Sequence, residues 1–470
     1  FPRLVKSDRP DDLIDENVMK SAWAQIIDSA NTHNDPGNFT TLIGYEYTSG
    51  PQSQNLHRNV FFRGDDAPAL PFSRIMSPNP EDLWAWMDGL RDKGVDSLAV
   101  PHNSNGSNGL MFKTEKWDGT PIDQEYAATR MRNEPLVEVT QVKGDSETHP
   151  ALSPNDEFAD FENYDYYIQV GKKNDYKASA ADYIRPALKR GLSIGQQVGV
   201  NPYKFGLIGS TDAHTGLSTS EEGNFWGKMA SDSTPETKER LGVQMRSNGW
   251  NMSASGIAAV WAKENTREAI YAAFKRKEVY ATSGPRLRVQ MFAGWDFPEG
   301  AESSESFSVI GSQFGVPMGG DLTAGDNDGK APVFLLRAVK DPLGANLDRL
   351  QVVKGWVDSA GQQQEKVYNV AWSDDRQLDA SGNLSPVGNT VNLSSGRYDN
   401  SIGQPEFSLR WTDPDFDPQQ SAFYYVRVLQ IPTPRNGLLD SLALELDEPP
   451  RGAKTIQERA YSSPIWYQPQ

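Results

Sequence analysis

The chain has 470 residues, which is too long for one ordinary domain, so we expect two domains and a sizeable buried core. Hydrophobic residues make up 37% of the sequence and aromatic residues 10%, a composition that excludes the disordered class, and no run of residues approaches the length of a membrane span. The formal net charge of −17 argues against nonspecific binding to nucleic acid or to anionic lipid.

The lack of cysteine excludes disulfides, zinc fingers and thiol catalysis. An acidic, cysteine-free chain rich in Trp and Asn is compatible with an exported protein, either periplasmic or secreted. The first residues have neither the basic start nor the apolar core of a signal peptide, and there is no initiator Met. We therefore expect the chain to begin inside a longer gene product.

Helical and strand patterns alternate in the first part of the chain. Apolar residues recur at helical spacing over residues 15–32, before the strand-like run TLIGYE. Residues 79–94 carry an N-cap, a first-turn proline and a terminal glycine, which predicts a second helix. Two more helices are expected, one over about 181–190 that Pro186 bends, and one that starts at Asn265 and ends before VYATSG. This alternation predicts an α/β domain with a mainly parallel sheet.

The character of the sequence changes after Pro285. Short runs rich in β-branched and aromatic residues, such as VFLLRAVK and AFYYVRVLQI, are separated by Gly, Asp, Asn and Pro turns. This pattern is typical of an antiparallel β-sandwich. We therefore predict an α/β domain over residues 1–285, a β-rich sandwich-like domain over 286–455, and a C-terminal segment, 456–470, that packs back on the first domain.

Three of the five histidines lie next to predicted strands, His57 in NLHRN, His102 in VPHNSN and His214 in STDAHTG. Glu46 ends one strand-like run and Asp212 follows another. Each histidine alone is explained equally well as a hydrogen-bonding loop residue. Together with the two carboxylates they favour a metal site, because divalent cations bind imidazole and carboxylate groups that converge from different strand ends.

The ordered strings GYE, LHRNV, PHN, LVEV and GSTDAH resemble the later metal motifs of the polymerase and histidinol phosphatase (PHP) superfamily. The whole chain is similar to an uncharacterised, often exported branch of it with a β-rich C-terminal region. The resemblance implies a distorted (β/α) PHP-type barrel that hydrolyses phosphoesters with two or three divalent ions, usually manganese, zinc or iron. It implies that Glu46 bridges two ions, that His57 and His102 bind one ion, and that Asp212 and His214 bind the others.

One departure concerns the start of the superfamily pattern. The pattern opens with a His-x-His pair on the first strand and an Asp-His pair soon after, and this chain has neither. We expect the barrel to lack its first strands in this chain, and an N-terminal segment of the same gene product to complete the site. The alternative is a degenerate barrel with one occupied metal position, for which Glu46, His57 and His102 already supply three ligands.

Other polar residues near these motifs have two interpretations. Arg58 and Lys143 are candidates for catalysis by holding an anionic substrate, but each can instead pair with a carboxylate. His149 either donates a proton to a leaving group or caps a turn. His33 falls in the last turn of the first predicted helix, where exposed carbonyls favour a structural role.

These residues predict a metal-dependent hydrolase in which metal-activated water attacks a small-molecule or saccharide-linked anionic ester. Asn59, Asn103 and Thr211 are expected to orient the metal ligands. One alternative is a catalytically incomplete barrel that serves as a carbohydrate- or protein-binding module. Another is a metal-dependent hydrolase of a sulfate ester, amide or lactone, because the metal set activates water whichever electrophile it meets.

Overall fold

The computed structural model describes residues 14–166, 176–217, 219–230, 233–242, 249–324, 329–447 and 453–469. The chain divides into two compact units, and each unit is assembled from separated segments. The first unit contains Phe1–Glu138, Asp165–Phe205 and Val260–Lys277, and the second contains Val139–Tyr164, Gly206–Ala259 and Glu278–Gln470.

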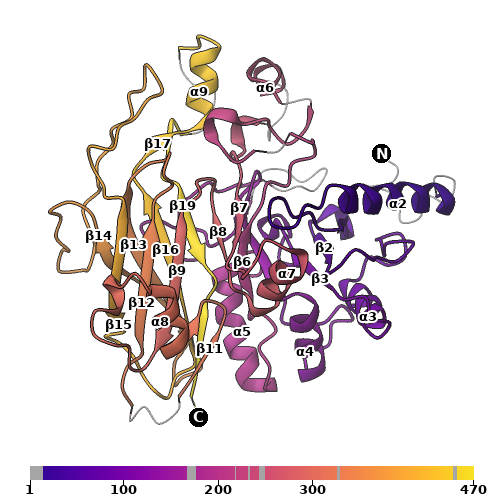
Figure 1. Ribbon diagram of the computed structural model, residues 1–470, viewed down its shortest axis with the longest axis horizontal. Helices are drawn as coiled ribbons and strands as arrows, with labels where there is room; N and C mark the ends of the chain where they lie inside the picture. The colour runs from indigo at the N-terminus through magenta and orange to yellow at the C-terminus, as the bar shows by residue number, and fades with distance from the viewer. Residues whose placement is uncertain are drawn as a thin grey trace. The chain divides into compact units, whose positions relative to one another are not determined.

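The first unit combines a small sheet with helices (Figure 1). Its helices are α2 (Glu16–Thr32), α3 (Pro80–Arg91), α4 (Gln124–Asn133), α5 (Ile184–Val198) and α7 (Arg267–Arg276). The sheet has the order β1 (Gly44–Tyr47), β2 (Arg58–Phe62) and β3 (Ser97–Pro101), and both neighbouring pairs are antiparallel. The mainly parallel sheet expected from the sequence is therefore wrong for these strands. No α-helix separates β1 from β2, so that connection cannot make the long crossover that parallel neighbours require.

The starts of the helices follow local caps. The side chain of Asp15 accepts the backbone N–H groups of the first turn of α2. Asn79 caps α3 and Pro80 occupies its first position, as the sequence predicts. The helix α7 begins after Thr266, whose side chain accepts the backbone N–H of Ala269, so Thr266 is the cap rather than the expected Asn265.

The helix α5 is longer than predicted and runs continuously from Ile184 to Val198. Pro186 lies in its first turn, where backbone N–H groups have no partner within the helix. The missing N–H of proline therefore costs nothing there, and the expected bend at Pro186 is wrong.

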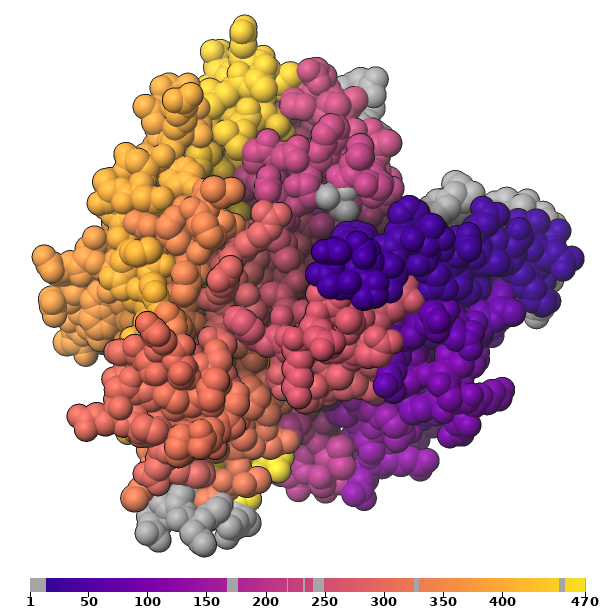
Figure 2. Space-filling model, in the orientation of Figure 1, coloured from indigo at the N-terminus to yellow at the C-terminus, as the bar shows by residue number. Residues whose placement is uncertain are grey.

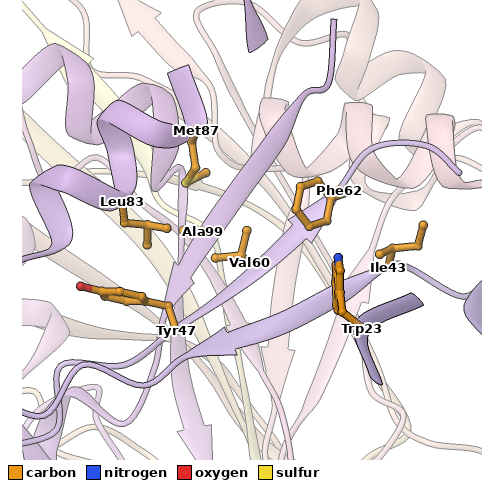
Figure 3. Packing of buried hydrophobic residues seen from close by; sticks show 8 residues of the cluster. All are labelled: Trp23, Ile43, Tyr47, Val60, Phe62, Leu83, Met87 and Ala99. Atoms are coloured by element: carbon orange, nitrogen blue, oxygen red, sulfur yellow. The ribbon is translucent and has the colours of Figure 1, made fainter. Parts of the chain in front are cut away.

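One face of the β1–β2–β3 sheet packs against α2 and α3 in a hydrophobic core (Figure 3). Val60 and Phe62 project from β2 into this core and are fully buried. Leu83 and Met87, one helical turn apart on α3, meet them there. From α2 only Trp23 is fully buried, and most of the helix surface is exposed (Figure 2). Each buried side chain of this size contributes roughly 1.5–3 kcal/mol by leaving water.

The second unit is dominated by antiparallel strands, in agreement with the pattern of the C-terminal sequence. One sheet has the order β10 (Gly315–Pro317), β9 (Arg288–Gly294), β12 (Val333–Val339), β15 (Glu406–Thr412). The larger sheet has the order β11 (Asp321–Thr323), β20 (Ile465–Gln468), β16 (Ala422–Gln430), β19 (Arg459–Ser462), β8 (Val279–Thr282), β7 (Ile257–Val260). β13 (Leu347–Val357) joins it by pairing with β16, and β14 (Gln363–Trp372) pairs with β13.

The two sheets stack face to face (Figure 1). Phe334 of β12 meets Tyr424 of β16 with ring centroids 4.8 Å apart, and Tyr368 of β14 meets Trp411 of β15 at 5.2 Å. Such aromatic pairs between inward faces are typical of a β-sandwich. Short helices lie outside the sheets, namely α6 (Pro235–Gly242), α8 (Phe307–Phe314) and α9 (Asn436–Ala443).

The last strands explain why the units do not follow the predicted boundaries at residues 285 and 455. β19 pairs on one side with β16 and on the other with β8, which precedes residue 285. The C-terminal segment is thus an interior strand of the larger sheet, and it draws β8 into the second unit. Hydrogen bonds between distant segments define the second unit. The amino-acid composition along the chain marked only the point at which the helix-and-strand pattern gives way to a strand-rich one.

The described residues form a mixed α/β fold. The hydrogen-bonded sheets in the described ranges are open, and none of them closes into a barrel. None of the described helices combines the length and apolarity needed to cross a membrane.

We predict that Phe62→Ala lowers the free energy of unfolding by about 3–5 kcal/mol, because it leaves a cavity in the core shown in Figure 3. Urea unfolding followed by tryptophan fluorescence measures the change. Val18→Ala on the exposed side of α2 is the control and should shift stability by about 0.5 kcal/mol or less. Equal effects of the two substitutions would contradict the packing described.

Candidate functional site

Strand alternation places the predicted ligands of the first unit on one face of its sheet. Glu46 pairs across β1 and β2 with Asn59, and Asn59 pairs with Val100 of β3. Residues directly opposite each other share a face, and successive residues alternate between faces. His57 immediately precedes β2 and lies two residues before Asn59. His102 immediately follows β3 and lies two residues after Val100. All of these side chains therefore lie on the face opposite the hydrophobic core.

The geometry brings Glu46, His57 and His102 together. His57 Nδ1 lies 2.6 Å from Glu46 Oε1, and His102 Nε2 lies 3.7 Å from the same oxygen. The imidazole rings are edge to face with centroids 5.5 Å apart. One ligand atom from each residue lies within 4.8 Å of the other two, so the three residues can hold a metal ion. This part of the predicted ligand set is assembled as expected.

His102 is held more firmly than the other two residues. It is buried, whereas Glu46 and His57 are partly exposed. The side-chain amide of Asn59 lies 3.2 Å from His102 Nδ1, in hydrogen-bond distance. The amide atom at this distance is Nδ2, whose N–H donates to Nδ1, so the ring proton lies on Nε2 and faces Glu46, and metal binding through Nε2 displaces that proton. Asn59 therefore occupies the orienting position predicted for it.

The loop after His102 is fastened by buried polar groups. Asn55 donates through its amide to the carbonyl groups of both His102 and Asn103. The backbone N–H of Asn103 donates to Glu138 Oε1 at 3.1 Å, and Asn103 itself has a left-handed backbone with φ 49°. Asn103 thus acts through the loop rather than on a ligand ring. Sequence reasoning missed Asn55, because an isolated asparagine before a strand has no distinctive pattern.

The remaining predicted ligands lie in the second unit. Asp212 follows β6 (Gly206–Gly209) in a left-handed conformation, with φ 52°. His214 Nε2 lies 3.5 Å from Asp212 Oδ1. The backbone N–H of Ala213 donates to the Thr211 hydroxyl, so Thr211 shapes this turn. The sequence-based expectation that Asp212 and His214 share a centre with Glu46 stays a prediction.

Two lysines contact Asp212. Lys143 Nζ donates to Asp212 Oδ2, and Lys228 Nζ donates to the same oxygen and to the Asp212 carbonyl, both at 2.7 Å. The pairing of Lys143 with a carboxylate is the alternative that the sequence left open. Burial, and then repulsion from Lys143, lower the pKa of Lys228 to about 8, although Asp212 opposes the shift. Lys228 was missed because its segment has no periodicity.

Arg58 does not have the predicted role of holding a substrate. As the neighbour of His57 along the strand it points to the opposite face, where only 2% of its side chain is exposed. Its Nε donates to Glu134 Oε1 at 2.8 Å, and Trp84 Nε1 donates to the same oxygen. Arg130 forms a second ion pair with Glu134 at 3.2 Å. This correction follows from strand alternation alone.

The charge of Glu134 depends on its two arginines. Burial by itself raises the pKa of this carboxyl, but Arg58 and Arg130 outweigh burial and hold the pKa below its usual value. The guanidinium of Arg130 also lies over the ring of Tyr203, 4.7 Å from the centroid. Arg58 is thus part of a buried ion network that joins β2 to α4.

His149 lies in a turn of the second unit. Its Nδ1 accepts the backbone N–H of Ala151 at 3.1 Å, and its carbonyl accepts those of Leu152 and Ser153. These bonds match the turn-capping interpretation of His149. His33 is the C-cap of α2, where its Nδ1 meets the carbonyl of Ser29 at 2.9 Å, as expected for a structural histidine.

We predict that Arg58→Met lowers the free energy of unfolding by about 3–5 kcal/mol, because it keeps the side-chain volume but leaves Glu134 buried with one arginine fewer. Chemical denaturation measures the change. Arg132→Met, which breaks a partly exposed pair with Asp88, is the matched control and should cost about 1 kcal/mol or less. Restoration of stability by Arg58→Met combined with Glu134→Gln would support the network, and a mild effect of Arg58→Met alone would refute it.

Comparison with known proteins assigns a family to the chain. A family model described as "Protein of unknown function (DUF3604)" matches residues 4–469. No curated protein matches the chain, and no solved structure does so. Because the match spans nearly the whole sequence, the chain belongs to the DUF3604 family.

Proposed function

We propose that this protein is a metal-dependent hydrolase, most simply of phosphoesters. The observation that carries the proposal is the convergence of Glu46, His57 and His102, whose ligand atoms lie within 4.8 Å of one another. Two imidazoles and one carboxylate are a ligand set typical of catalytic metal sites, because they leave a coordination position for water. Closed structural sites instead use four protein ligands.

The donor atoms fit a transition metal better than magnesium or calcium. Imidazole nitrogens suit zinc and iron, and a carboxylate also suits manganese, whereas magnesium and calcium prefer sites made of oxygen atoms. The orientation of the His102 ring by Asn59 is the kind of support that metal-binding histidines have. Partial exposure of Glu46 and His57 gives solvent and substrate access to the same side chains.

Each residue has a distinct part in the proposed reaction. When bound, a divalent ion lowers the pKa of a coordinated water and polarises the ester. Glu46 supplies the negative charge that holds the ion, and His57 and His102 supply neutral donors. The hydrogen bond from Asn59 to Nδ1 and the buried loop around Asn103 keep the His102 ring in place. Lys143 and Lys228 are proposed to attract an anionic substrate.

The proposal extends to the fold and to the ligands outside the first unit. We propose that the first unit belongs to a distorted PHP-type barrel followed by the β-sandwich, with Asp212 and His214 as further ligands. An N-terminal segment of the same gene product is proposed to supply the His-x-His and Asp-His motifs. Manganese, zinc and iron remain the candidate ions, and export to the periplasm or outside the cell remains the expected location.

We predict that purified protein binds at least one transition-metal ion and that Glu46→Gln and His102→Ala lose it. Turnover of p-nitrophenyl phosphate should fall about 100-fold or more in both variants, because a direct ligand is removed. Elemental analysis measures the metal and initial rates measure the turnover. His33→Ala is the control, since His33 lies at the exposed end of α2.

The same experiment separates the proposed hydrolase from its alternatives. Protein without bound metal, even after incubation with manganese, zinc or iron, would favour a carbohydrate- or protein-binding module. Protein with bound metal that cleaves p-nitrophenyl sulfate, an amide or a lactone but not the phosphate would favour hydrolysis of another bond. Full activity of Glu46→Gln with its metal retained would refute the assignment of the site.

A further inference from the structure

A second cavity lies entirely within the second unit and involves none of the candidate metal ligands. Its volume is about 380 Å³, which falls in the range of small-molecule pockets and far exceeds the space of a bare ion. It is lined by the 3-10 helix η4 (Glu222–Asn224), the turn after β8, and residues next to α9 and β19.

Two acidic residues of this cavity, Glu222 and Glu458, are held by hydrogen bonds. Glu458 is 4% exposed, and its Oε2 accepts a hydrogen bond from the Ser283 hydroxyl. Glu222 Oε2 accepts hydrogen bonds from the backbone and the side-chain amide of Asn436, the first residue of α9. Glu222 Oε1 is buried and has no hydrogen-bond partner in the described part of the chain. A buried carboxylate oxygen without a donor costs free energy unless a ligand or water meets it.

The arginines behind the cavity have other partners. Arg435 is bound by Glu162 through two hydrogen bonds of 2.9 and 2.7 Å, so its charge is already matched. The guanidinium of Arg459 lies over the ring of Phe161, 3.6 Å from the centroid, and donates to the carbonyl of Phe158. Among these described groups, three carboxylates therefore face two guanidinium groups.

Burial and the excess of carboxyl groups change the pKa of Glu458. Burial, and then the negative charge of Glu222, raise the pKa of Glu458 well above its usual value. Two buried carboxyl groups near each other cannot both ionise cheaply without a neighbouring cation. The rim of the cavity adds Glu221 and Asp341 against a single arginine, Arg286. Acidic side chains thus outnumber basic ones among the residues that line the cavity.

We propose that this cavity binds a small organic cation whose ammonium group lies between Glu222 and Glu458. An ammonium group supplies both the missing charge and up to three hydrogen-bond donors for the carboxyl oxygens of the two residues. The carbon skeleton of the ligand fills the volume that a metal ion would leave empty. This site is independent of the proposed metal-dependent hydrolysis.

Titration calorimetry with 1,4-diaminobutane on the full chain tests the proposal, with 1,4-butanediol as the neutral probe of the same length. We expect saturable binding of the diamine and none of the diol. Glu222→Gln and Glu458→Gln should each weaken binding about tenfold or more, because each removes one charge-assisted hydrogen bond. Glu305→Gln is the matched control, since Glu305 is an exposed glutamate of the same unit that does not line the cavity.

A second measurement separates loss of the ligand from loss of the fold. Because the raised pKa of Glu458 favours its neutral form in the empty cavity and Gln resembles that form, the empty Glu458→Gln variant should melt near the temperature of the unmodified protein, yet gain no stability from the diamine. Absence of diamine binding at millimolar concentration would overturn the proposal. Equal binding of diamine and diol, or unchanged binding in both buried variants, would overturn it as well. Metal content and ester hydrolysis are separate readouts and do not enter this test.

Discussion

The alternation of side chains along β2 is the constraint on which the candidate metal site depends. Arg58, Val60 and Phe62 face the helices, and the intervening residues face the other way. The same five-residue strand therefore supplies one side of a hydrophobic core and one wall of a possible metal centre. The antiparallel register aligns Glu46 with Asn59 and places both histidines beside them. A shift of one residue would exchange the two faces and destroy both features at once.

Buried carboxylates are balanced in three different ways in this protein. Glu134 has two arginines and an indole N–H, and remains charged. Asp212 has two lysines, one of which loses part of its basicity to burial. Glu222 and Glu458 share their surroundings with arginines that are already engaged. The last arrangement is the least balanced, and for that reason it carries the inference of a cationic ligand.

Local sequence signals predicted several helices correctly. The caps at Asn79 and Pro80, and the amphipathic pattern of α2, correspond to helices at the predicted places. Pro186 was misread because its effect depends on its position within the helix, and the helix start at Tyr183 carries no side-chain cap to mark it. The prediction that Arg58 holds a substrate was wrong because it rested on the position of Arg58 next to His57 in the sequence. Successive residues of a strand point to opposite faces of the sheet.

The sequence by itself determined the local elements, the β-rich C-terminal region and the residue types able to bind a metal. These depend on interactions over a few residues, which a linear pattern records. Only the tertiary structure decided the antiparallel order of β1–β2–β3, the entry of β19 between β16 and β8, and the meeting of Glu222 with Glu458 in one cavity. Those features join segments far apart in the chain, and their free energy comes from pairing, burial and charge compensation that no local window contains.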